Sequence, residues 1–168
     1  MMNKNVSAWF KNKELFKREL EKGHKWEMEV GQFFVELGYD VTLPEPPVAG
    51  KRGDFVDQKD LVVVGHIIEV KSRGQKFTSH ADFPFETIFI DTKQGFDAKA
   101  EKPSLYICVS QKTGGMCALD VAKSFKHWQV ERTFDQVRKI GLVAYSCHKD
   151  IWEDVEEAAR RVIGSIED

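Results

Sequence analysis

An acidic residue and a lysine stand two positions apart in an otherwise apolar stretch, Ile67-Ile68-Glu69-Val70-Lys71. Successive residues of a strand point to opposite faces of a sheet, so Glu69 and Lys71 are expected to share one face while Val70 points into the core. Burial of such charges is costly unless they are paired, hydrated or bound to a metal. The pattern therefore indicates a site of chemistry rather than part of the core.

Two carboxylates beside a lysine suit the hydrolysis of a phosphodiester. Asp54 begins an extended segment and is the expected partner of Glu69, with Asp57 and Asp60 as alternatives. Carboxylate oxygens are hard ligands for Mg²⁺ or Mn²⁺, and such an ion lowers the pKa of bound water and stabilises developing negative charge. Lys71 would orient the water or neutralise the transition state.

The elements that would position these residues are predicted from hydrophobic spacing. We expect helices flanking a mixed central sheet, which is an α/β fold. One domain spans 1–168, with an N-terminal helical extension over about 1–22 that includes a helix over 7–21. The other predicted helices cover 24–37, with Gly38 as the C′ residue, 93–102 and 151–163, with a short helix or turn over 121–127. A short strand or extended segment is expected over 39–43, and a strand starts at 51–56. The segments 61–64 and 66–71 are expected to form two strands with a tight connection, or one bent strand pair, and further strands cover 87–91, 105–110, 116–120 and 141–147.

Two motifs resemble a known group of enzymes. Gly53-Asp54-Phe55 followed by Ile68-Glu69-Val70-Lys71-Ser72 resembles the PD-(D/E)xK nuclease superfamily, in which an aspartate opens a strand and E-x-K on the next strand completes the metal site. Gly23-His24-Lys25-Trp26-Glu27 is similar to the G-x-x-x-E helix of archaeal-type Holliday junction resolvases. The resemblance covers about 23–72, and Gly53 stands where the motif name has proline. It implies a restriction-endonuclease-like core and a role for Glu27, or alternatively Glu29, in metal binding.

The resemblance implies a Mg²⁺- or Mn²⁺-dependent DNA endonuclease. The expected catalytic residues are Glu27, Asp54, Glu69 and Lys71; the three carboxylates would bind the metal, with the backbone carbonyl of Val70 as a further ligand. The expected substrate is branched DNA, as for a junction resolvase, or a specific duplex site, as for restriction and homing enzymes. A homodimer would place two sites on two strands. The alternatives are a non-catalytic nucleic-acid-binding module of the same fold, and a structural protein in which Glu69 and Lys71 form a surface pair.

Several polar residues near the motifs are candidates for DNA contacts. Lysine and arginine side chains bind phosphates and so position a duplex, although a solvated loop is the alternative for any such group. Gln94 loosely matches a glutamine that some members of the superfamily place near the scissile phosphate. The basic candidates are Lys51, Arg52, Arg73, Lys76 and Lys93.

Length and composition set limits on the class of protein. A chain of 168 residues with 42% hydrophobic residues can bury one core. The net charge of −2 lacks the positive excess of many nucleic-acid binders, but the local distribution of charge matters more than its sum. No apolar run approaches the roughly 20 residues that span a membrane. Three cysteines without CxxC spacing and the absence of a signal-like N-terminus predict a cytoplasmic protein, in the host cell if a phage encodes it.

Overall fold

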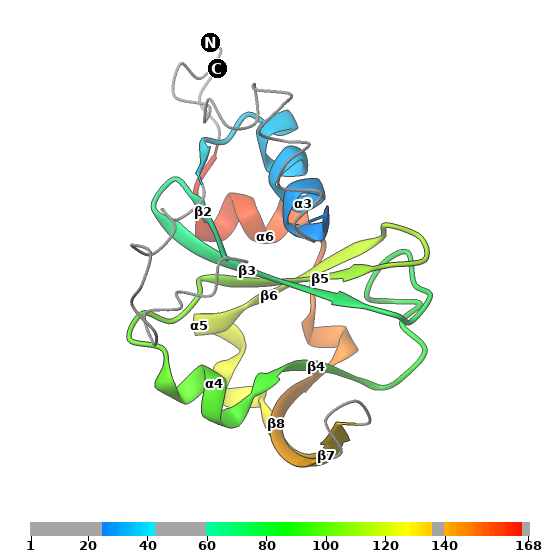
Figure 1. Ribbon diagram of the computed structural model, residues 1–168. Coiled ribbons are helices and arrows are strands. Elements are labelled where there is room, and N and C mark those ends of the chain that lie inside the picture. The colour runs from blue at the N-terminus through cyan, green and yellow to red at the C-terminus, as the bar shows by residue number, and fades with distance from the viewer. Residues whose placement is uncertain (1–24, 43–59, 136–139, 166–168) are drawn as a thin grey trace, which may run out of the picture.

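The computed structural model describes residues 25–42, 60–135 and 140–165 (Figure 1). The helix predicted over 7–21 and the aspartate predicted to bind metal, Asp54, lie outside these residues. The helices are α3 (Lys25–Glu36), α4 (Lys93–Ala98), α5 (Val121–Ser124) and α6 (Val155–Val162), with 3-10 turns η1 (Phe125–His127) and η2 (Lys149–Ile151). The strands are β1 (Val41–Thr42), β2 (Asp60–Val63), β3 (His66–Arg73), β4 (Thr87–Thr92), β5 (Leu105–Ser110), β6 (Met116–Asp120), β7 (Gln129–Asp135) and β8 (Ile140–His148).

The strands form two sheets. The central sheet has the order β1-β2-β3-β5-β6, and it is mixed because β3 and β5 run parallel while the other pairs are antiparallel. The second sheet has the order β4-β8-β7 and is antiparallel throughout. Helices α3 and α6 cover one side of the central sheet, and the second sheet lies on the other side with α4 and α5 (Figure 1). The predicted α/β class with a mixed sheet flanked by helices is confirmed.

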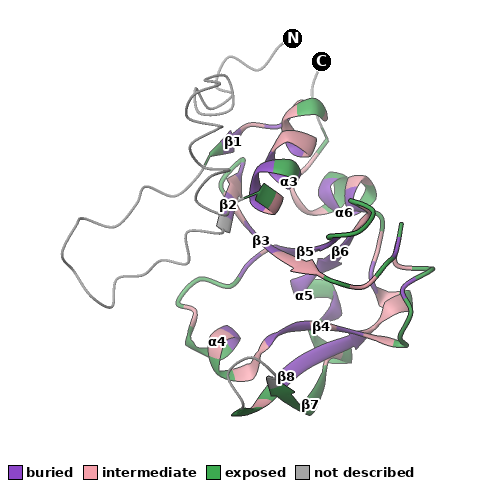
Figure 2. Cartoon of the chain, turned by 45° about the vertical axis from the view of Figure 1, so that its right-hand side comes forward, coloured by how far each residue is buried: buried purple, intermediate pink, exposed green. Residues whose placement is uncertain are grey.

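Strand alternation divides the buried residues of the central sheet into two layers. On the helix side, Ile68 and Val70 of β3 pack with Val30 and Phe34 of α3 and with the buried face of α6. On the other side, Tyr106 and its neighbours pack against the second sheet, and the strands between the two layers are buried along much of their length (Figure 2). This second group consists of Phe77, Phe83, Ile88, Ile90, Phe96, Tyr106, Cys108, Cys117, Leu119, Val121, Tyr145, Cys147 and Trp152.

A two-residue turn joins β2 to β3. Val64 and Gly65 both have positive φ, at 49° and 80°. A tight hairpin turn needs two consecutive residues of positive φ to match the twist of its strands. This conformation is energetically unfavourable for a β-branched residue such as Val64. The tight connection predicted between these strands is confirmed, and it sets the register in which Asp60 lies opposite Glu69.

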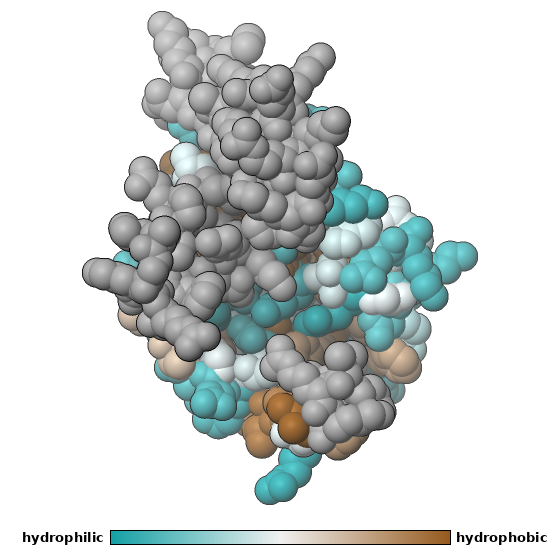
Figure 3. Space-filling view, in the orientation of Figure 1, coloured by the Kyte–Doolittle hydropathy of each residue, from teal (hydrophilic) through white to brown (hydrophobic). Residues whose placement is uncertain are grey.

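Strand β7 was not predicted. Its alternate residues Val130, Arg132 and Phe134 lie on one face of the β7–β8 pair, where Val143 is the neighbour of Arg132. Val130, Phe134 and Val143 are exposed. The strand therefore lacks the buried hydrophobic stripe by which a strand is usually predicted from sequence. Hydrophobic surface is visible at this end of the molecule, over β8 and β7 (Figure 3).

The helix ends also differ from the predictions by a few residues. Helix α3 and its C′ residue Gly38, at φ 99°, are as predicted. Helix α4 ends at Ala98 rather than at Lys102, and α6 begins at Val155, because Asp154 caps it by accepting a hydrogen bond from the Glu157 amide. Within the described ranges, the structure contains no helix with the length and apolar character needed to cross a membrane.

Candidate functional site

Glu69 and Lys71 lie on the central strand β3, on the face that points away from α3. Their neighbours Ile68 and Val70 belong to the layer under the helices, so alternation turns Glu69 and Lys71 toward the second sheet. The shared face predicted for these two side chains is confirmed. The Lys71 ammonium lies 2.9 Å from Glu69 Oε1.

Glu69 is a buried carboxylate with an unusual environment. The residue is only 1% exposed, and the ammonium of Lys99 lies 3.1 Å from its second oxygen, Oε2. Neither oxygen, however, accepts a hydrogen bond of good geometry from any residue that the structure describes. The two ammonium groups are therefore close enough to neutralise the charge, but they leave the lone pairs of Glu69 without well-aligned donors.

Asp91 faces Glu69 from the second sheet. The ammonium of Lys71 lies 3.6 Å from Asp91 Oδ1, and that of Lys99 lies 3.9 Å from Asp91 Oδ2. Each ammonium thus lies within 4 Å of both carboxylates. We call Glu69, Lys71, Asp91 and Lys99 the charge cluster.

A β-bulge turns Asp91 toward Glu69. Between Phe89 and Asp91 the register with β8 shifts, so that Ile90 is an extra residue on β4. Strict alternation would place Asp91 on the face opposite to the buried Ile88 and Ile90, whereas the bulge allows Ile90 and Asp91 to be buried in succession. The buried position of Asp91 is therefore a consequence of tertiary pairing.

Two hydrogen bonds orient the Asp91 carboxylate. The Tyr106 hydroxyl donates to Oδ2 at 2.8 Å, and the Thr92 amide donates to Oδ1 at the same distance. Tyr106 is the neighbour of Glu69 in the register of β3 and β5, so its ring rises from the same face of the central sheet. The central sheet and the β4–α4 corner together fix the relative position of the two carboxylates.

Glu27 lies on the helix that covers the opposite face of the central sheet. It is buried on α3 and belongs to the same stripe as Val30 and Phe34, whereas the alternative residue Glu29 is exposed. The burial of Glu27 distinguishes these two candidates. The charge cluster itself opens toward β4 rather than toward α3.

Asp54, Asp57, Lys51 and Arg52 lie outside the described residues. The alternative aspartate Asp60 begins β2 and occupies the register position opposite Glu69.

The predicted DNA-binding residues on the described ranges are spread over different environments. Lys76 and Gln94 are exposed, and Lys93 is paired with Asp97 one turn later on α4. The pairing with Asp97 raises the pKa of Lys93. Arg73 lies on β3, two residues after Lys71.

The Arg73 guanidinium is partly enclosed. It lies 4.5 Å from the centre of the Phe89 ring, and its Nε is buried without a hydrogen-bond partner among the described residues. Burial lowers the pKa of Arg73, while the charge of Asp91 acts in the opposite direction. A guanidinium remains protonated in either case, so Arg73 adds positive charge beside the cluster.

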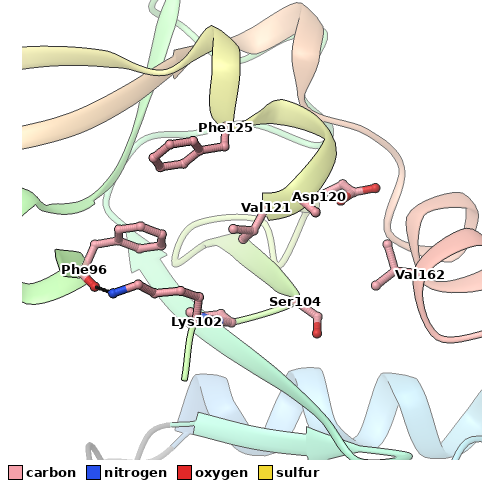
Figure 4. A pocket seen from close by; sticks show the side chains of 9 residues that line it. Phe96, Lys102, Ser104, Asp120, Val121, Phe125 and Val162 are labelled. Carbon is pink, nitrogen blue, oxygen red and sulfur yellow. Dashed lines mark hydrogen bonds between the residues drawn. The ribbon is translucent and has the colours of Figure 1, made fainter. Parts of the chain in front are cut away.

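The charge cluster is separate from the apolar hollow that Figure 4 shows between α4, α5 and α6. This hollow has a volume of about 600 Å³, and none of the four cluster residues lines it. Its lysine, Lys102, donates a hydrogen bond to the Phe96 carbonyl (Figure 4). It also donates to the carbonyls of Asp97 and Lys99 at the end of α4. The predicted catalytic residues Glu69 and Lys71 therefore lie outside this hollow.

Three members of this site were missed in the sequence: Asp91, Lys99 and Tyr106. A carboxylate that ends an apolar strand just before a helix, as in Ile88-Phe89-Ile90-Asp91-Thr92, was the one available signal for Asp91. Among the described residues, no three histidine, cysteine, aspartate or glutamate side chains are grouped to hold a metal ion. Within the charge cluster, the carboxylates that could hold an ion are Glu69 and Asp91.

Comparisons with known proteins add no relative. No protein-family model matches the chain, and no curated protein or solved structure shows significant similarity to it.

Proposed function

We propose that this protein is a divalent-metal-dependent DNA endonuclease whose catalytic strand is β3, with Glu69 as metal ligand and Lys71 as the cationic residue beside it. One observation carries the proposal. Glu69 is fully buried on the same face as Lys71, and neither of its carboxylate oxygens has a well-aligned donor among the described residues. A structural ion pair would normally satisfy those lone pairs.

The residues present fit Mg²⁺ or Mn²⁺. Glu69 and Asp91 supply hard oxygen donors, and the backbone carbonyl of Val70 is a further donor. Strand β3 pairs with β2 only as far as Glu69, so from Val70 onward one of its edges has no described partner strand. When bound, the ion would lower the pKa of a water molecule and stabilise the charge that develops on the phosphate.

The protein's own groups would act on the water and the phosphate. The Lys71 ammonium, held 2.9 Å from Glu69, is placed to donate a hydrogen bond to the attacking water or to a non-bridging phosphate oxygen. Attack by the water oxygen forms the new P–O bond while the water gives up a proton to solvent. The bond to the leaving deoxyribose oxygen breaks, and that oxygen takes up a proton from solvent. Arg73 and the exposed Lys76 would neutralise nearby phosphates.

The order of elements supports a restriction-endonuclease-like interpretation of the core. A helix with a buried glutamate, α3, is followed by the antiparallel strands β1, β2 and β3, and β5 then joins the sheet parallel to β3. The E-x-K pair lies on β3, the third of these strands, and this position supports the proposed resemblance. Asp54 remains the predicted first carboxylate, and the register position of Asp60 keeps it as the alternative.

The substrate, assembly and location follow from the same proposal. Branched DNA of the four-way-junction type is the first substrate to test, and a specific duplex site is the second. A homodimer would cut two strands. The three cysteines are buried and free, which supports a reducing compartment such as the cytoplasm, in the host cell if a phage encodes the chain.

The test is cleavage of plasmid, linear, single-stranded and four-way-junction DNA with Mg²⁺, with Mn²⁺ and with a chelator. We expect metal-dependent cleavage that falls by roughly two orders of magnitude in Glu69→Gln and in Lys71→Met. Glu101→Gln, which changes an exposed carboxylate outside the cluster, is the control. Asp54→Asn and Asp60→Asn decide which aspartate is the first carboxylate.

Two results would overturn the proposal. Cleavage at the wild-type rate in folded Glu69→Gln or Lys71→Met would remove these residues from the site. Binding of DNA that a chelator leaves unchanged, without cleavage of any substrate, would instead favour a non-catalytic nucleic-acid-binding module. Circular dichroism and urea unfolding show whether each variant is folded.

A further inference from the structure

Two buried carboxylates and two ammonium groups alternate in the charge cluster. Lys99 lies 3.1 Å from Glu69 Oε2 and 3.9 Å from Asp91 Oδ2, so its nitrogen is held between the two acids. Glu69 and Asp91 are 1% and 6% exposed. Two carboxylates this buried need nearby positive charge to compensate for their removal from water.

We propose that Glu69 and Asp91 together bind a divalent cation, and that the Lys99 ammonium occupies the position of this cation when the ion is absent. The inference deepens the proposed function, on which it rests for the choice of ion. It assigns Asp91 as a ligand and Lys99 as a built-in competitor of the metal.

The geometry of Glu69 supports a replaceable cation. Its oxygens lie near Lys71 and Lys99, yet neither receives a hydrogen bond of good geometry from a described residue. Asp91, in contrast, is held by the Tyr106 hydroxyl and the Thr92 amide. One acid is thus oriented in advance and the other keeps lone pairs for a ligand, which is the arrangement expected of a preformed cation site.

Lys99 rather than Lys71 is the ammonium that would leave. Lys71 is anchored on the central strand β3 and lies closer to both acids, at 2.9 and 3.6 Å. Lys99 follows the last residue of the short helix α4 and lies farther from both acids, at 3.1 and 3.9 Å. The flexible four-carbon stem of a lysine allows its charged group to move into water.

Replacement of the Lys99 ammonium by a divalent ion also makes the local net charge positive. With both lysines in place, the two acids and two ammonium groups sum to zero. With a divalent ion in place of Lys99, Glu69, Asp91, Lys71 and the ion sum to one positive charge. Such a site attracts a phosphate group only after the metal has bound, so metal binding would precede DNA binding.

The experiment is calorimetric titration of the full chain with Mn²⁺ alone. We expect Asp91→Asn to weaken binding by about tenfold or more, and Lys99→Met to tighten it by about tenfold, because the competing charge is gone. The matched controls are Glu101→Gln and Lys126→Met, which change exposed charges outside the cluster and should leave the affinity for Mn²⁺ unchanged.

A second measurement needs no variant. An amine-reactive reagent followed by mass spectrometry reports how accessible each lysine is. We expect saturating Mn²⁺ to increase the modification of Lys99 severalfold and to leave that of Lys126 unchanged.

The outcomes separate this inference from the proposed nuclease function. Wild-type affinity for Mn²⁺ in Asp91→Asn, or weaker binding in Lys99→Met, would overturn the inference even if metal-dependent cleavage is found. The expected affinities without cleavage of any DNA would support the inference and reject the nuclease. Failure of the wild-type chain to bind Mn²⁺ would overturn both.

Discussion

At the scale of single residues, burying the charges of the cluster costs stability, and the same charges are the groups available for chemistry. Removing Glu69 from water costs several kcal/mol unless nearby charges compensate, and the two ammonium groups supply that compensation. A fully apolar replacement would satisfy the core equally well. The retention of four charges in this layer is therefore better explained by a ligand than by folding alone.

Removal of the Lys71 charge should destabilise the protein. Lys71→Met leaves Glu69 and Asp91 buried with Lys99 as the remaining ammonium of the cluster, and we expect the free energy of unfolding to fall by about 3 kcal/mol. Urea unfolding measures it. The double variant with Glu69→Gln should recover part of the loss, since one buried negative charge is removed as well. A loss no larger than that of Lys126→Met would contradict this account.

At the scale of elements, the corner between β4 and α4 positions half of the site. The bulge at Ile90 buries Asp91, and Thr92 then caps α4 by accepting a hydrogen bond from the Gly95 amide at 3.0 Å. Helix α4 ends beside Lys99. A six-residue helix with so few internal hydrogen bonds depends on its cap.

Gly95 is required by this corner. A Cβ at Gly95 would lie 2.6 Å from Thr92 Oγ1 and 3.4 Å from Asp91 Oδ1, so Gly95→Ala forces the capping hydroxyl to move. We expect thermal or urea unfolding to show a loss of about 1–2 kcal/mol. Gly141→Ala is the control, because a Cβ there meets no atom within 4 Å. Equal stability of the two variants would show that the cap is dispensable.

A second prediction at this scale concerns the loop before β4. Asp82 accepts hydrogen bonds from the amides of Ser79 and Thr78 and from the Thr78 hydroxyl, and these bonds lower its pKa below the ordinary value of 3.8. A carboxyl group with a lowered pKa stabilises the folded loop at higher pH, and this contribution is lost as the pH falls through the folded-state pKa.

We therefore expect the amides of Thr78 and Ser79 to lose protection from hydrogen exchange in strongly acidic solution, after correction for the intrinsic exchange rate. Exchange measured by NMR over a pH series would check this. In Asp82→Asn the protection should be low and independent of pH. Protection in the wild type that persists at the lowest pH would contradict the role of the carboxylate.

At the scale of the whole molecule, the turn between β5 and β6 is packed against the chain that leads from β3 to β4. Ser110 Oγ donates a hydrogen bond to the Gln75 carbonyl at 2.7 Å, and Thr113 Oγ1 donates to the Phe77 carbonyl. A Cβ at Gly115 would lie 2.6 Å from both the Phe77 carbonyl oxygen and the Thr78 Cα. This contact links the central sheet to the segment that enters the second sheet.

Gly115→Ala should therefore destabilise the entire fold, because backbone atoms cannot move aside as a flexible side chain can. We expect a loss of about 3 kcal/mol in the free energy of unfolding, near the upper range for overpacking. Gly74→Ala, where a Cβ meets no atom within 4 Å, should have a much smaller effect. Urea unfolding of the two variants side by side measures the difference, and equal losses would contradict the packing account.

Much of the frame could be predicted from the sequence. Helix α3 and its terminal Gly38, the tight β2–β3 turn and the β5–β6 hairpin each carry a local signal in spacing or in turn residues. Strand β7 could not be predicted, because its apolar residues face solvent. The second sheet was equally hidden, since nothing local to β4 indicates that β8 is its partner.

The sequence by itself determined that Glu69 and Lys71 point to the same side of a buried strand, because alternation along a strand is a local property of the backbone. Only the tertiary structure decided that Asp91 and Lys99 join them. The bulge that turns Asp91 inward arises from pairing between β4 and β8, and Lys99 approaches Glu69 only after the chain has crossed between two sheets. Such proximity depends on packing between segments distant in the sequence, and the spacing of residues along the chain does not predict it.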